Sequence, residues 1–289
     1  MNITLVHSGA LGDTVLLAPL LRSLKQRWPG AQRTVVMRPS FGRMLVDLAV
    51  AEAAADGDDS LHSRWFAAGN WGLDAALPWA GCDLLISAVS SGDDPWADHA
   101  RRLARAGEIL FFNPLPPADF PGHVTEFQRG QLMELALPIP PLPPVRHNVN
   151  GAVLIHPGAG SRAKCRPPAQ FVLLGQRLLR AKKPVEFVLG EAELQRWDES
   201  QIDMLGNEFC IHKMPALPDL TRMLRAAAAY IGHDSGPTHL AAALGLPTVA
   251  AFTVTDPRRW RPVGPRVVTA DEAASVDQIA ALVLKMLKE

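Results

Sequence analysis

The chain has 289 residues, and its 29 lysines and arginines are balanced by 29 aspartates and glutamates. That length allows two domains of ordinary size, and the balanced charge argues against a nucleic-acid-binding protein, which would carry a basic stripe. The three cysteines, Cys82, Cys165 and Cys210, lie far apart without metal-ligand spacing. This pattern predicts a reducing compartment and no disulfide framework.

The chain also shows no targeting or membrane-spanning pattern. Its opening residues, MNITLVHSG, lack the basic region and long apolar core of a signal peptide. No apolar run approaches the roughly 18–20 residues that cross a bilayer. We therefore expect a soluble, cytoplasmic protein.

Short β-rich runs alternate with helical patterns along the whole sequence. In chain order, strands are expected at Asn2–His7, Thr34–Arg38, Asp83–Ser90, Glu108–Phe112, Ala152–His156, Val185–Leu189, Phe209–His212, Ala229–Gly232 and Thr248–Phe252. Helices are expected at Val15–Arg27, with a kink or late start at Pro19, and at Phe171–Ala181, Asp219–Ala228 and Val276–Lys288. Such alternation predicts an α/β fold of parallel sheets covered by helices on both faces.

A proline-rich stretch separates the two halves. Leu137–Gly151, LPIPPLPPVRHNVNG, contains five prolines, so it is neither a helix interior nor a central strand and should form a stiff linker. We predict two domains, residues 1–140 and 141–289; a long surface loop within one domain is the alternative. Each half opens with a strand and a glycine-bearing turn, and open α/β sheets bind ligands at that strand end. Two such sheets facing each other would enclose a central cleft.

The most informative segment is Tyr230–Phe252, YIGHDSGPTHLAAALGLPTVAAF. Its pattern predicts a short strand, a polar turn and a helix of small residues. The first turn of a helix leaves N–H groups unpaired at the positive end of the helix dipole, where phosphate is a common partner. Gly236 lets a ligand approach the backbone, and polar groups flank the same opening: Asp234, Ser235, Thr238 and His239. A phosphorylated ligand is predicted here.

Two further glycine-bearing turns follow expected strands. In HSGALGD the glycines precede Asp13 but do not complete a dinucleotide fingerprint. Asp13 is either a helix cap or a group that accepts a proton. In HPGAGSRAK, Gly160, Ser161 and Lys164 make a plausible phosphate cradle, although the segment is not a P-loop. An ordinary turn with a solvated lysine is the alternative.

Several other features have simpler structural explanations. Glu191 and Glu193 follow a strand, where an acid either pairs with ribose hydroxyls or caps a helix. Asp56-Gly57-Asp58 matches a metal-binding DxD pattern, but AEAAADGDDS is more typical of a helix end running into a solvated acidic turn. No histidine pair shows clear metal-ligand spacing, and two histidines at strand ends, His7 and His156, fit core positions. Tryptophans cluster in the first half, where they either line an acceptor surface or pack in the core; among them are Trp65, Trp71, Trp79 and Trp96.

Three segments together resemble glycosyltransferase family 9, the heptosyltransferase-like enzymes of bacterial lipopolysaccharide assembly. They are Ser8–Ala31, SGALGDTVLLAPLLRSLKQRWPGA; His156–Leu178, HPGAGSRAKCRPPAQFVLLGQRL; and Gly232–Gly264, GHDSGPTHLAAALGLPTVAAFTVTDPRRWRPVG. The last is the most specific, because Asp-Ser-Gly-Pro-x-His and the downstream Thr-Asp-Pro occur together and in order. The likeness fades between about Phe41 and Pro144.

The resemblance implies a GT-B architecture with an acceptor-side N-terminal domain and a nucleotide-sugar-binding C-terminal domain, both Rossmann-like. It implies an inverting, metal-independent transfer without a cofactor, typically from ADP-heptose, with Asp13 as general base. Gly160, Ser161 and Lys164 would contact the diphosphate. Glu193 would contact the ribose, and Met214 would lie near the base. The remaining donor-binding positions lie in the polar turn and helix start of Tyr230–Phe252: Asp234, Ser235, Gly236, Thr238 and His239.

The resemblance also implies partners: a nucleotide-sugar donor and a glycolipid or oligosaccharide acceptor, with no nucleic acid. Contact with the cytoplasmic face of the inner membrane stays open, since no strong basic amphipathic helix stands out. Arg166 stands two places after the lysine, where the family often has an aromatic residue, and the chain is short for a heptosyltransferase. A sugar-nucleotide epimerase of the same fold and a non-catalytic nucleotide-sugar-binding module are the alternatives.

Overall fold

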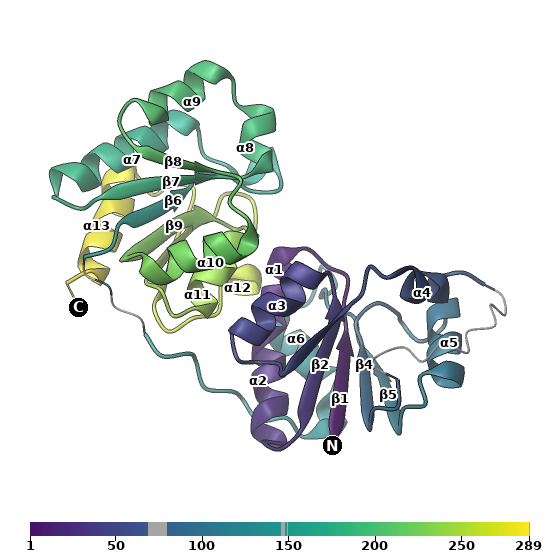
Figure 1. Ribbon diagram of the computed structural model, residues 1–289. Coiled ribbons are helices and arrows are strands. Elements are labelled where there is room, and N and C mark those ends of the chain that lie inside the picture. Colours follow the sequence, from purple (N-terminus) through teal and green to yellow (C-terminus); the bar gives the residue numbers. More distant parts are fainter. Residues whose placement is uncertain (69–79, 146–147, 149, 289) are drawn as a thin grey trace. The chain divides into compact units, whose positions relative to one another are not determined.

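The computed structural model describes residues 1–68, 80–145, 148 and 150–288 and divides into two compact units, Met1–Pro141 and Leu142–Glu289 (Figure 1). Each unit has its own parallel sheet with helices packed against it. The boundary between the units falls within the proline-rich stretch. Among the described residues, no helix combines the length and apolar character needed to cross a membrane.

The first unit is built on a five-stranded parallel sheet in the order β3-β2-β1-β4-β5. Its strands are β1 (Asn2–Val6), β2 (Gln32–Met37), β3 (Ala53–Asp56), β4 (Leu84–Ser87) and β5 (Glu108–Phe111). Its helices are α1 (Leu11–Leu16), α2 (Ala18–Arg27), α3 (Pro39–Asp47), α4 (Ser60–Ser63), α5 (Pro95–Leu103) and α6 (Val124–Gly130), with short 3-10 turns η1 (Arg64–Phe66) and η2 (Met133–Leu135). The strand order reverses between β1 and β4, whose residues are almost all buried.

The helix predicted at Val15–Arg27 is interrupted near Pro19, where a kink or a late start was expected. Helix α1 ends at Leu16, and α2 begins at Ala18 with Pro19 in its first turn. Proline is tolerated in a first turn because that position has no intrahelical N–H partner to lose. The break therefore turns one amphipathic pattern into two helices.

The acidic turn after AEAAA does not follow a helix, so that interpretation is wrong. Ala53–Asp56 forms β3, which pairs in parallel with β2 from Thr34 to Met37. Alanine favours helix locally, but pairing with a neighbouring strand overrides a weak propensity over four residues. Asp58 is exposed, and its backbone N–H donates to the Asp56 carboxylate at 2.8 Å, as expected of a solvated turn.

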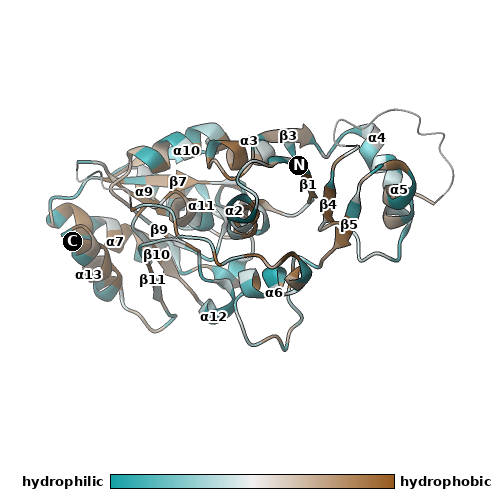
Figure 2. Cartoon of the chain, turned by 90° about the horizontal axis from the view of Figure 1, so that it is seen from below, coloured by the Kyte–Doolittle hydropathy of each residue, from teal (hydrophilic) through white to brown (hydrophobic). Residues whose placement is uncertain are grey.

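Two of the first-half tryptophans form part of the first unit's core. Trp65 and Trp96 are each 1% exposed and pack with Val6, Val36 and Leu85. Trp96 also donates its indole N–H to His62 at 3.0 Å. The core interpretation is confirmed for these two, while Trp71 and Trp79 lie outside the described residues. Strands β4 and β5, which belong to the same unit, are coloured as hydrophobic (brown) in Figure 2, whereas α5 is largely coloured as hydrophilic (teal).

The second unit is built on a six-stranded parallel sheet in the order β11-β10-β9-β6-β7-β8. Its strands are β6 (Val153–His156), β7 (Val185–Leu189), β8 (Cys210–Lys213), β9 (Ala229–His233), β10 (Thr248–Ala251) and β11 (Val267–Ala270). Its helices are α7 (Pro168–Arg180), α8 (Glu191–Arg196), α9 (Glu199–Gly206), α10 (Leu217–Ala226), α11 (Gly236–Ala243), α12 (Pro257–Trp260) and α13 (Val276–Met286), with the 3-10 turn η3 (Arg162–Lys164).

Helices cover both faces of this second sheet (Figure 1). Helices α7, α9 and α13 lie on one face, and α10 and α11 lie on the other. The larger core cluster joins Phe171 and Leu178 of α7 and Val283 of α13 to inward side chains of the strands, such as Phe187 and Ile231. This arrangement confirms the predicted α/β class with parallel sheets. Strand β11 was missed because it is short, lies at the sheet edge and is only partly buried.

Arg166 is a buried anchor within the second unit. Its guanidinium donates to the backbone oxygens of Ala274 at 2.9 Å, Asp271 at 2.6 Å and Glu272 at 3.1 Å. Its backbone N–H donates to Nε2 of His233 at 3.0 Å. Arginine therefore fastens the loop after β6 to the connection between β11 and α13.

We predict that Arg166→Met lowers the free energy of unfolding by roughly 2–4 kcal/mol, because methionine leaves buried carbonyl oxygens without their charged donor. Urea denaturation followed by circular dichroism measures the change. The control is Arg162→Met, which removes the same charge from an exposed position in the same loop. Equal urea midpoints for the two variants would contradict the anchoring role.

Candidate active site

The sequence-predicted donor residues lie in loops at the carboxyl edge of the second sheet. Strands β6 and β9 are neighbours, and the chain leaves them in opposite directions, toward β7 and β8 on one side and toward β10 and β11 on the other. Open α/β sheets bind ligands at such a reversal of strand order, beyond the carboxyl ends of the strands. The loop that carries Lys164 follows β6, and the turn that begins at Asp234 follows β9. The topology therefore brings these two segments together.

A buried carboxylate, that of Asp234, is the centre of this site. One of its oxygens accepts from Nζ of Lys164 at 2.7 Å and from the Thr255 hydroxyl at 2.9 Å. The other oxygen lies 3.3 Å from Nε2 of His239. Asp234 is 7% exposed, so these three partners replace the water that a carboxylate would otherwise bind.

Charge pairing keeps this carboxylate ionised. Burial alone would raise the pKa of Asp234, but the hydrogen bonds from His239 and Lys164, together with their charges, outweigh burial and lower the pKa to about 2. The ammonium group of Lys164 has three N–H donors, and its side chain keeps 30% of its surface exposed. Donors therefore remain on Lys164 for an anionic ligand.

The start of α11 is the second positive feature at this edge. Ser235 is the N-cap residue with an extended backbone, and its side chain makes no cap hydrogen bond to the helix. Its hydroxyl instead lies 3.1 Å from that of Thr238, which donates to the backbone oxygen of His233 at 2.6 Å. Gly236 opens the helix without a side chain. Pro237 has no N–H, and that of Thr238 donates to the backbone oxygen of Ser235 at 3.1 Å. The helix start thus offers the N–H of Gly236 and a positive dipole end to an anion.

The glycine-rich loop after β6 is fixed by hydrogen bonds from an arginine side chain. Arg196 of α8 donates to the backbone oxygens of Ala159 at 3.0 Å and Gly160 at 2.7 Å. Gly160 and Ser161 are exposed, and a Cβ added at Gly160 would meet nothing within 4 Å. Gly158 is different, because a Cβ there would lie 1.2 Å from Oε1 of Glu193. Packing therefore requires glycine at position 158 but not at position 160.

Glu193 is buried and serves first as a helix cap. Its carboxylate accepts the N–H of Gly190 at 2.6 Å and lies 3.5 Å from Nε2 of His156. Burial would raise the pKa of Glu193, but the contact with His156 and the Gly190 N–H leave it lowered. A cavity of 310 Å³ adjoins this carboxylate and is also lined by Cys165 and Trp197. The capping role is present in the structure, and the ribose role stays a prediction.

Met214 occupies the loop directly after β8. Its backbone has a positive φ of 46° and its side chain is 57% exposed. The N–H of Met214 donates to the backbone oxygen of Leu189, the last residue of β7, at 2.7 Å. An exposed thioether at the carboxyl edge of the sheet suits contact with a flat ring, but its place near a base stays a prediction.

Asp13 belongs to the first unit, after β1 and beside the reversal of strand order there. It is the third residue of α1, and its carboxylate accepts the N–H of Ala10 at 3.2 Å. Asp13 therefore caps α1, which is one of the two roles that the sequence allowed for it. His7 is buried and accepts the N–H of Gly9 at 3.1 Å. Burial lowers the pKa of His7 to about 4, although the charge of Asp13 opposes this, so His7 is neutral at physiological pH.

The structure thus joins five of the predicted positions by direct contacts: Lys164, Asp234, Ser235, Thr238 and His239. It adds Thr255, Gly158 and Arg196, which the sequence prediction did not include. Thr255 stood in a recognised Thr-Asp-Pro segment, and Gly158 stood in a glycine-rich turn, so both had a signal. Arg196 had none, because its carbonyl partners lie 36 and 37 residues away.

Comparison with known proteins identifies the family. The profile of glycosyltransferase family 9, described as heptosyltransferase, matches residues 133–278, more than half of the sequence. The chain belongs to glycosyltransferase family 9. A lipopolysaccharide heptosyltransferase 1 from Campylobacter coli is 30% identical over 108 residues. That alignment covers 36% of this chain and only 32%, about a third, of the relative.

Two solved structures show the fold of this family 9 protein. A glycosyltransferase family 9 protein from Veillonella parvula has a TM-score of 0.72 at 14% identity, covering 99% of this chain and 97% of that one. The E. coli heptosyltransferase WaaC, solved with ADP, has a TM-score of 0.69 at 16% identity, covering 100% and 99%. Together with the two parallel sheets, these matches confirm the predicted GT-B fold.

Gly158→Ala tests the packing between the glycine loop and α8. We expect the new methyl group to push the Glu193 carboxylate out of its place and to lower the free energy of unfolding by roughly 1–3 kcal/mol. Thermal unfolding of purified protein measures this loss. Gly160→Ala is the matched control, since its methyl group meets nothing within 4 Å. A wild-type melting temperature for Gly158→Ala would show that the loop rearranges freely.

The ionised state of Asp234 predicts an acid-sensitive contribution to stability. Because its pKa falls from 3.8 to about 2 on folding, the carboxylate stabilises the fold above about pH 4, and this contribution is lost as the pH falls toward 2. Wild-type unfolding free energy should therefore drop by about 2 kcal/mol more than that of Asp234→Asn over this interval. Denaturant titrations at stepped pH measure the difference.

Asp203→Asn removes an exposed carboxylate of α9 and controls for the change in total charge. Identical pH dependence of wild type and Asp234→Asn would show that the Asp234 carboxylate is not preferentially ionised in the folded protein.

Proposed function

We propose that this protein is an inverting, metal-independent glycosyltransferase that moves heptose from ADP-heptose to a lipopolysaccharide-type or other glycan acceptor. The observation that carries the proposal is the Lys164–Asp234 pair beside the start of α11, at the reversal of strand order. Family membership favours transfer over the epimerase and binding-module alternatives. The choice of ADP rests on the E. coli relative, which was solved with ADP.

The proposed donor site suits a departing diphosphate. As the bond between the anomeric carbon and the diphosphate oxygen breaks, negative charge collects on the phosphate oxygens. The remaining donors of Lys164, the backbone N–H of Gly236 and the positive end of the α11 dipole would stabilise that charge. Such preorganised donors act strongly because they need no reorientation during the reaction. Asp234 keeps the ammonium group in place by holding one of its N–H groups.

Asp13 would supply the base for the other half of the reaction. The acceptor oxygen attacks the anomeric carbon from the face opposite the diphosphate, which inverts its configuration. As the new bond forms, the bond to the diphosphate breaks and the nucleoside diphosphate leaves, and the acceptor hydroxyl gives its proton to the Asp13 carboxylate. A carboxylate is a weak base, so proton transfer would occur late, when the attacking hydroxyl has become acidic.

Two substitutions separate these roles. Asp13→Asn should lower turnover of ADP-heptose with a lipopolysaccharide-core acceptor by about 100–10,000-fold, while ADP affinity stays at the wild-type value. Lys164→Met should weaken ADP binding by about 10–100-fold through loss of charge-assisted hydrogen bonds. Coupled detection of released ADP measures turnover, and titration calorimetry measures affinity.

The control is again Asp203→Asn, which should match wild type in both assays. Wild-type turnover in Asp13→Asn would remove Asp13 as the base. Tight ADP binding without turnover in the wild-type protein would favour the binding module, and formation of an epimeric sugar nucleotide without acceptor would favour the epimerase. Tighter binding of UDP or GDP than of ADP would overturn the proposed donor.

A further inference from the structure

The free edge of the second sheet carries a cluster of three side chains that the proposed reaction does not use. Strand β8 is the edge strand, and its register with β7 pairs Cys210 with Glu186 and His212 with Val188. Side chains alternate along a strand, so Glu186, Cys210 and His212 project from one face. The inward residues Val185, Phe187 and Leu189 occupy the opposite face, against the helical core.

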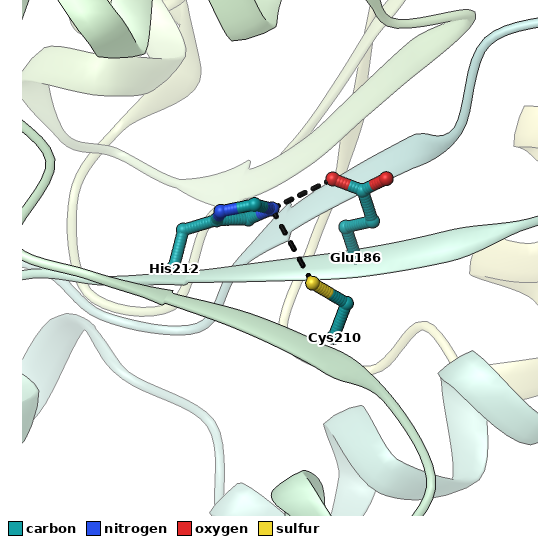
Figure 3. Close-up of side chains that lie close together, drawn as sticks. All are labelled: Glu186, Cys210 and His212. Carbon is teal, nitrogen blue, oxygen red and sulfur yellow. Dashed lines mark hydrogen bonds and ion pairs between the residues drawn. The ribbon is translucent and has the colours of Figure 1, made fainter.

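The three side chains converge on one point (Figure 3). Nε2 of His212 lies 2.7 Å from Oε2 of Glu186, and Sγ of Cys210 lies 3.7 Å from the same nitrogen. One ligand atom from each residue lies within 4.8 Å of the others. The cluster is open to solvent, with Cys210 exposed and the side chains of His212 and Glu186 33% and 37% exposed.

These separations are close to those of a tetrahedral zinc site. Zinc binds thiolate at about 2.3 Å and imidazole or carboxylate at about 2.0–2.2 Å, which places neighbouring ligand atoms roughly 3.3–3.6 Å apart. The sulfur-to-nitrogen distance of 3.7 Å is within about 0.1 Å of this range. The nitrogen-to-oxygen distance would have to open by about 0.6 Å, and half-exposed glutamate and histidine side chains permit such a movement.

The ligand types decide between a metal site and an ordinary ion pair. A histidine–glutamate pair alone would explain the short contact, but it gives no reason for a third ligand group, a thiol, within hydrogen-bond distance of the same ring nitrogen. Thiolate, imidazole and carboxylate are the three side-chain ligands that zinc uses. A thiolate disfavours magnesium and calcium, which prefer oxygen ligands.

We propose that Glu186, Cys210 and His212 bind one zinc ion, or a cation of similar softness, with the fourth position open to water or a further ligand. Binding displaces the thiol proton of Cys210 to solvent, so affinity should rise with pH. Bound metal would cross-link β8 to β7 at the point where β8 has no other strand neighbour. It would thereby hold the strand that leads directly into Met214.

Cobalt substitution tests the proposal. Full-length protein is stripped with a chelator and titrated with Co²⁺, which should give a thiolate-to-cobalt charge-transfer band with a stoichiometry of one. Zn²⁺ should bleach the band, and Mg²⁺ should not. Cys210→Ser should abolish it, whereas Cys165→Ser, which removes another partly accessible thiol, should retain it. Circular dichroism checks that each variant is folded.

Zinc affinity from titration calorimetry gives a second reading. His212→Gln and Glu186→Gln should each weaken Zn²⁺ binding at least about tenfold, while His123→Gln, a histidine of the first unit, should leave it unchanged. Absence of the cobalt band in wild type, or its persistence in Cys210→Ser, would overturn the site. Unchanged zinc affinity in both His212→Gln and Glu186→Gln would do the same.

Discussion

A single buried carboxylate organises the second unit's ligand edge. Asp234 directly follows β9 and contacts three other side chains, those of Lys164, His239 and Thr255. A buried charge is tolerated only when its partners are in place, so the loops after β6, β9 and β10 must take up one mutual arrangement. That requirement fixes an ammonium group beside a helix start, and two positive features then face the same space.

Much of the fold follows from local patterns. Nine strands were predicted as short apolar runs, and the division of the first helix followed from Pro19. The failures occurred where long-range pairing decides the conformation. Ala53–Asp56 is a strand only because β2 lies beside it, and Val267–Ala270 only because β10 does. The first segment, AAAD, is made of helix-favouring residues, and the second, VVTA, is a short strand at the sheet edge.

The site was predictable to the extent that its groups sit in recognisable turns. The glycine turns and the Asp-Ser-Gly-Pro-x-His segment predicted most of the residues that lie together at the reversal of strand order between β6 and β9. Contacts made across the sheet could not be predicted, such as that of Arg196 with the glycine loop. The same holds for Cys210 and His212: two residues apart, they carry no zinc signature until the register of β7 adds Glu186. Strand pairing, rather than sequence spacing, creates that set.

The contact between Gly158 and Glu193 has a consequence for how this protein can vary. The space that a side chain at position 158 would need is already filled by the carboxylate of residue 193. The side chains at positions 158 and 193 therefore share one space. A larger residue at position 158 requires a shorter one at position 193, and that change would also remove the cap of α8. Engineering of the second unit should randomise the pair jointly, since single changes at either position leave a clash or a hole.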